Sequence, residues 1–245
     1  MGKKEMLALG AQLRALLQEG QVEKAYSRLA PILAERTPFP LLELLGQAIP
    51  HEKVSISEAF LEEIAAHGTE GGWVVIASAL RECLQADLAR AFNWAHKYIL
   101  QADVWYAADI FGERVPGPAL LLYFDQALSF LALWREDSSP WIRRTVGVAV
   151  HFWAKRTRGA PEFWPQARAL LNLLDPLFEE HELAAVKGIG WGLKTVGRYY
   201  PALLIGWLEE QLWQRHRHPR ALMLRKALTY LPPAQRGPLE EALAR

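Results

Sequence analysis

An indole and a carboxylate stand four residues apart in the segment Trp105-Tyr106-Ala107-Ala108-Asp109. On a helix, this spacing places both side chains on one face. A carboxylate beside an aromatic ring can stabilise a positively charged group by charge attraction and by cation–π contact. The ordinary alternative is a core aromatic residue next to an ion-paired or capping acid. Trp105 and Asp109 are therefore a candidate pair for stabilising a cation.

Basic residues recur along the chain at the spacing of a helical repeat. Similar segments begin at Arg144, Lys187 and, more loosely, Arg225, which are 43 and 38 residues apart, and Trp105 lies 39 residues before Arg144. Periods of about 40 residues are typical of HEAT and armadillo repeats. The three cations would then lie at matching places along one wall, with Trp191 one turn beyond Lys187. Such a row suits a phosphate backbone, although internal ion pairs would also account for it.

The elements that must position these residues are predicted to be helices. Apolar residues recur three and four positions apart, for example within residues 13–17, 56–64 and 128–133, and short Pro- and Gly-containing breaks separate the stripes. Ser139-Pro140 predicts a helix start, because a proline in the first turn sacrifices no hydrogen bond. We expect an all-α fold, an α-solenoid of HEAT-like or armadillo-like repeats with a concave basic surface, in one domain of residues 1–245.

Composition indicates a folded protein with an uneven charge distribution. Of the 245 residues, 51% are hydrophobic, and 28 Lys and Arg balance 27 Asp and Glu. Residues 1–137 carry a net charge of −6 and residues 138–245 a net charge of +7. This asymmetry favours an anionic partner for the second half. The single Cys83, the lack of a long apolar run and the lack of a metal-ligand cluster lead us to expect a cytoplasmic protein without membrane, metal or cofactor.

Several conspicuous residues have ordinary explanations. Most of the ten tryptophans are expected to pack between helices. The basic run from Arg215 to Arg220 is interpreted as a solvated loop rather than a phosphate contact, because its members rarely share one face. His151 is expected to be satisfied by local hydrogen bonds rather than to be catalytic.

Four motifs resemble the AlkD-like branch of the DNA alkylation repair family, which are HEAT-like-repeat DNA glycosylases. The resemblance covers roughly residues 87–231, whereas residues 1–86 are divergent and Tyr26 is only a weak match to a tyrosine of the family's first repeat. The motifs occur in the family's order: Trp105-x-x-x-Asp109, Pro140-Trp141-Ile142-Arg143-Arg144, Val186-Lys187-Gly188-Ile189-Gly190-Trp191-Gly192-Leu193-Lys194 and Leu224-Arg225-Lys226-Ala227-Leu228.

The resemblance implies a role for each matching residue. Asp109 would be the catalytic carboxylate, Trp105 and Trp191 would flank the deoxyribose of the damaged nucleotide, and Arg144 would steady the acid or contact the DNA backbone. The implied activity is excision of cationic N3- or N7-alkylated purines by a monomer acting on duplex DNA. A relative that binds DNA structures or a protein without catalysis is the alternative. The expected DNA contacts are Arg143, Lys187, Lys194, Arg225 and Lys226.

Overall fold

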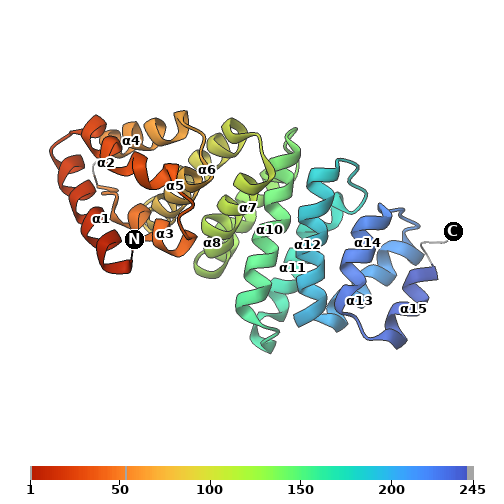
Figure 1. Ribbon diagram of the computed structural model, residues 1–245. Helices are drawn as coiled ribbons and strands as arrows, with labels where there is room; N and C mark the ends of the chain where they lie inside the picture. Colours follow the sequence, from red (N-terminus) through yellow and green to blue (C-terminus); the bar gives the residue numbers. More distant parts are fainter. Residues whose placement is uncertain (1, 53, 242–245) are drawn as a thin grey trace. The chain divides into compact units, whose positions relative to one another are not determined.

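The computed structural model describes residues 2–52 and 54–241, and every regular element within them is helical (Figure 1). This confirms the all-α prediction. The chain divides into two compact units, residues 1–115 and 116–245. The expectation of one domain over the whole chain stays a prediction, and the two units are described separately.

The first unit contains seven helices in its described residues, and alternate helices pack against one another. One layer is formed by α1, α3, α5 and α7, each packed on the next, while α2, α4 and α6 form the other layer. The bounds are α1 (Lys3–Gln18), α2 (Val22–Ala34), α3 (Phe39–Ala48), α4 (Val54–Ala66), α5 (Glu70–Cys83), α6 (Leu88–Ala102) and α7 (Trp105–Arg114).

The second unit repeats this alternation. Helices α8, α10, α12 and α14 pack in sequence to form one layer, and α9, α11, α13 and α15 form the other. Short 3₁₀ turns and one π-helical turn, η3, join or extend them. The bounds are α8 (Pro116–Leu122), α9 (Phe124–Trp134), α10 (Pro140–Thr157), η1 (Pro161–Phe163), α11 (Trp164–Leu174), η2 (Asp175–Leu177), α12 (Leu183–Tyr199), α13 (Pro201–Glu209), η3 (Glu210–Gln214), α14 (Ala221–Ala227), η4 (Leu228–Tyr230) and α15 (Pro233–Glu241).

Successive helical hairpins stacked in two layers are the arrangement of an α-solenoid of helical repeats, as the sequence period predicted. Arg144, Lys187 and Arg225 lie on α10, α12 and α14, which are consecutive helices of one layer (Figure 1). The helix start at Ser139-Pro140 is also confirmed. The Ser139 hydroxyl accepts a hydrogen bond from the Trp141 amide, and Pro140 occupies the first helical position.

Glycines allow the backbones of α10 and α12 to approach each other closely. A Cβ atom at Gly147 would lie 2.3 Å from the carbonyl oxygen of Gly188, and one at Gly192 would lie 2.7 Å from the carbonyl oxygen of Gly147. A Cβ atom at Gly188 would lie 2.5 Å from the carbonyl oxygen of Arg144. Because each obstacle is backbone, a side chain at these positions would push the two helices apart.

We expect Gly188→Ala to destabilise the protein by about 1–3 kcal/mol, because the clash outweighs alanine's better helix propensity. Urea unfolding followed by circular dichroism measures this change. Gly206→Ala in α13 is the matched control, since a Cβ atom there meets nothing within 4 Å. The control should be neutral or stabilising by up to about 1 kcal/mol. Equal stabilities of the two variants would contradict the assigned packing.

Candidate nucleic-acid interface and carboxylate site

The indole and carboxylate of the first unit lie on the opening turns of α7. Helix α6 ends at Asp103 in the left-handed conformation (φ 47°), and Val104 is extended, so α7 begins anew at Trp105. Trp105 is 56% exposed and meets the ring of Tyr106 edge-on at 5.8 Å. Asp109, one turn later, is half-buried. The helix therefore presents an accessible indole beside a partly shielded acid.

A buried ion pair fastens the other end of α7 to α3. Arg114 is 8% exposed, and its Nη2 lies 2.7 Å from Oε1 of Glu43. The guanidinium also lies 5.6 Å from the centre of the Phe39 ring and donates to the carbonyl of Ile110. A buried charge held by a carboxylate and an aromatic ring fixes the orientation of its helix. This contact limits the rotation of α7 and hence the direction of Asp109.

Charge is segregated by layer in the second unit. Helices α10, α12 and α14 contain no Asp or Glu at all, and every carboxylate of residues 116–245 lies in another element or in a loop. The cations of the three helices are Arg143, Arg144, Lys155, Arg156, Lys187, Lys194, Arg198, Arg225 and Lys226. The basic half of the sequence is thus resolved into one basic layer, which is the electrostatic signature of a phosphate-binding surface.

Trp191 lies on this basic layer. The spacing along α12 puts Lys187 and Lys194 one turn to either side of it on the same face. Trp191 is half-buried, and its ring stacks on His151 of α10 with centroids 3.9 Å apart. Nδ1 of His151 lies 2.7 Å from the Thr195 hydroxyl, which confirms the predicted local hydrogen bond. The stack itself was not predicted from the sequence.

The two arginines of the α10 motif are held inside the unit. Arg144 is 7% exposed, its stem lies against Gly188, and its Nη1 donates to the carbonyl of Ala184 at 3.1 Å. Nε of Arg143 lies 2.5 Å from Glu180, and its Nη1 donates to the carbonyl of Asp137. These contacts agree with the alternative that such cations serve internal bonding. A DNA contact from Arg143 stays a prediction and would have to compete with the ion pair.

The remaining predicted DNA contacts differ in accessibility. Lys187 and Arg225 are exposed, whereas Lys194 and Lys226 are half-buried. Nζ of Lys194 lies 5.1 Å from the centre of the Tyr230 ring, and the stem of Lys226 packs on Gly190. Lys187 and Arg225 are accordingly the best placed of the four to meet a phosphate.

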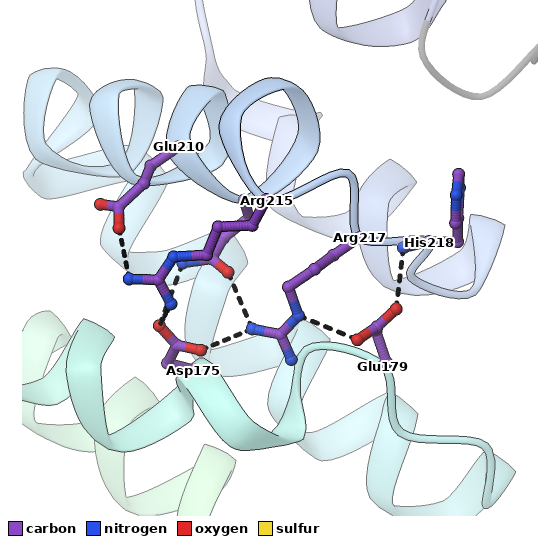
Figure 2. A network of polar contacts seen from close by, with 7 residues as sticks. Asp175, Glu179, Glu210, Arg215, Arg217 and His218 are labelled. Carbon is purple, nitrogen blue, oxygen red and sulfur yellow. Dashed lines mark hydrogen bonds and ion pairs between the residues drawn. The ribbon is translucent and has the colours of Figure 1, made fainter.

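The basic run at the end of η3 forms an internal ion-pair network (Figure 2). Arg217 binds Asp175 and Glu179, the latter at 2.9 Å, and is only 16% exposed. Arg215 binds Asp175 at 2.8 Å and also Glu210. The expectation of a solvated loop was wrong for Arg217, because carboxylates about 40 residues earlier in the chain fold against the loop.

Tyr26 lies on α2, in the layer opposite α7 within the first unit. Its ring stacks on His67 with centroids 4.5 Å apart. Burial, followed by the negative charge of Glu63, raises the pKa of the Tyr26 hydroxyl. Its match to the family's first-repeat tyrosine stays a prediction.

Comparison with known families identifies the chain. The model of the family described as DNA alkylation repair enzyme matches residues 47–231, so the protein belongs to that family. The match begins well before residue 87, where the recognisable motifs start, and ends at the same residue. Family membership indicates an enzyme with a role in the repair of alkylated DNA. Searches of curated proteins and of solved structures found no match.

Two further findings bear on the site. Within the described residues, no group of His, Cys, Asp and Glu is arranged to hold a metal ion. In the same residues, no helix is both long and apolar enough to cross a membrane.

We expect Arg217→Gln to lower the melting temperature by about 2–4 °C at neutral pH and to change its dependence on pH. A backbone hydrogen bond from His218 and the Arg217 side chain hold the pKa of Glu179 below its usual value. That stabilisation is present above the unfolded-state pKa and is lost as the pH falls through the folded-state value. The wild type should therefore lose more stability below about pH 4.5 than the variant.

Thermal melting between pH 3 and pH 7 measures this difference. Arg236→Gln is the control, because its exposed pair with Glu240, one turn away on α15, should contribute little. Parallel pH curves for the wild type and Arg217→Gln would contradict the assigned role of the network.

Proposed function

We propose that the protein is a DNA glycosylase that excises cationic N3- and N7-alkylated purines from duplex DNA. The observation that carries the proposal is the pair on α7, an exposed indole one turn before a half-buried carboxylate, within the segment that matches the family. The basic layer of α10, α12 and α14 supports duplex DNA as the substrate.

The proposed reaction needs no proton on the leaving base. Alkylation at N3 or N7 gives the purine a positive charge, so the electrons of the C1′–N9 bond pass to the base and release it as a neutral molecule. The deoxyribose is left with the positive charge. Water then attacks C1′ and loses a proton, which yields an abasic site. The barrier depends on how well the protein stabilises the sugar cation.

Asp109 is proposed to supply that stabilisation. A carboxylate near C1′ attracts the growing positive charge and can orient the attacking water. The faces of Trp105 and Trp191 would add cation–π contact to the same sugar. We propose that Arg144 steadies this arrangement, or contacts the DNA backbone, from its buried position on α10.

The basic layer is proposed to bind the phosphates. Lys187, Lys194, Arg225 and Lys226 lie on two adjacent helices of the layer and supply cations on both sides of Trp191 along the chain. Arg143 would join them only by giving up part of its contact with Glu180. That this layer forms a concave wall stays a prediction.

We expect Asp109→Asn to slow release of N7-methylguanine by about 10²-fold or more, because the amide keeps the shape and removes the charge. Single-turnover base release from a methylated duplex measures the rate. The affinity for DNA should change only a few-fold. Asp125→Asn, at an exposed acid on α9, is the control and should leave the rate unchanged.

Two results would contradict the proposed chemistry. Equal rates for wild type and a folded Asp109→Asn would refute the role of the carboxylate. Salt-sensitive DNA binding without base release from either N7-methylguanine or N3-methyladenine would instead favour the non-catalytic DNA-binding relative. Binding that is insensitive to salt and directed to a protein would remove DNA as the partner.

We expect Lys187→Gln and Arg225→Gln each to weaken DNA binding and to reduce the slope of log K against log salt by about 0.9. Fluorescence anisotropy with an undamaged duplex, at several salt concentrations, measures the slope. Arg217→Gln is the control, since its guanidinium is already bound by Asp175 and Glu179. A larger loss of slope for Arg217→Gln than for the other two would place the DNA elsewhere.

A further inference from the structure

The imidazole of His151 covers one face of the Trp191 indole. The rings are nearly parallel, with an interplanar angle of 25° and centroids 3.9 Å apart. His151 is 7% exposed, whereas Trp191 is half-buried. A ligand that reaches this indole can therefore meet only the opposite face or the ring edge. The stack joins α10 to α12, the two helices that their glycines bring together.

A threonine hydroxyl fixes the imidazole in turn. The Thr195 hydroxyl donates to the backbone carbonyl of Trp191 at 3.0 Å and lies 2.7 Å from Nδ1 of His151. A hydroxyl carries a single hydrogen, and here the carbonyl receives it. The same oxygen then accepts the proton of Nδ1. This arrangement selects the neutral tautomer with its hydrogen on Nδ1 and sets the plane of the ring.

The same helix pair carries a second copy of this arrangement in the core. The Thr157 hydroxyl donates to the carbonyl of Trp153 and accepts from the Tyr200 hydroxyl at 2.7 Å. The rings of Trp153 and Tyr200 stack at an angle of 21°. Both of these rings are only 1% exposed, so this copy serves packing alone. The copy at Trp191 holds an indole that reaches the surface, where its orientation matters to a ligand.

We propose that His151 is a positioning residue that holds Trp191 at a fixed angle with an uncharged ring and leaves one indole face for the sugar of the damaged nucleotide. The inference deepens the proposed glycosylase function and rests on it. The identity of the ring matters as much as its shape. A neutral imidazole leaves the electron-rich indole face to the sugar cation, whereas an imidazolium would set a like charge behind that face.

The surroundings keep the ring neutral at physiological pH. Burial, followed by the positive charge of Lys155 one turn later on α10, lowers the pKa of His151 to about 4. Of the residues packed around the imidazole, Trp191 and Thr195 on α12 carry no charge. Protonation would also compete with the cations of the basic layer.

His151→Ala should slow single-turnover base release by on the order of 10-fold, since a small displacement of a group near the reacting atoms is enough to do so. The DNA dissociation constant should change less than about twofold, because the phosphate contacts are untouched. His151→Phe, which retains a flat uncharged ring, should recover most of the lost rate. Thr195→Val should slow release to an intermediate extent.

Thr157→Val is the matched control. It removes the equivalent hydroxyl from the buried copy, so it should lower the melting temperature without slowing release by the folded protein. A rate for His151→Ala equal to that of the wild type would overturn the inference. So would a rate for His151→Phe no better than for His151→Ala, or a loss of rate that DNA affinity alone accounts for.

A measurement without catalysis separates this inference from the proposed function. Long-range proton–nitrogen NMR on histidine-labelled protein, with His151→Phe for assignment, should show the proton on Nδ1 of His151, and Thr195→Val should weaken that preference. The opposite tautomer in the wild type would overturn the inference whatever the activity. Failure of the Asp109→Asn test with the expected tautomer present would count against the proposed chemistry and not against the clasp of His151 on Trp191.

Discussion

The close approach of α10 and α12 is the constraint on which the second unit depends. Gly147, Gly188 and Gly192 remove the side chains that would separate the two backbones. Only at this separation can the imidazole of α10 stack at 3.9 Å on the indole of α12. The same approach lays the stem of Arg144 along Gly188, so its head reaches the first turn of α12. Packing and the candidate interface are therefore one structure here, since the glycines that close the core also set the angle of a surface indole.

Segregation of charge by layer explains how a chain of net charge +1 can present a surface for an anion. Carboxylates are confined to the outer elements of the second unit, where several neutralise arginines, as Asp175 and Glu179 do for Arg217. The cations of α10, α12 and α14 have no acid on their own helices. Binding of a polyanion responds to the local potential within about a Debye length, not to the sum over the molecule. The average charge is thus a poor guide to the partner of this protein.

Local sequence signals predicted the helices, and periodic signals predicted their order. Apolar spacing and Pro- or Gly-containing breaks act within a few residues, so the start of α10 at Pro140 was correctly expected. The repeat period placed Arg144, Lys187 and Arg225 on successive helices of one layer. The contacts between helices were not predicted, because they depend on how each helix is rotated about its axis. The separation of 40 residues between His151 and Trp191 matches one repeat, which was the available signal that they lie on neighbouring helices.

The state of His151 bears on which bases the proposed enzyme can release. A neutral purine leaves readily only after protonation, which requires a general acid near the base. His151 is the only imidazole on α10, α12 and α14, and its lowered pKa of about 4 leaves it without a proton to give at neutral pH. Around Trp191 the layer offers an aromatic face and fixed positive charges instead. Such surroundings suit a substrate whose base arrives already charged, because the chemical damage itself has supplied what the acid would otherwise provide.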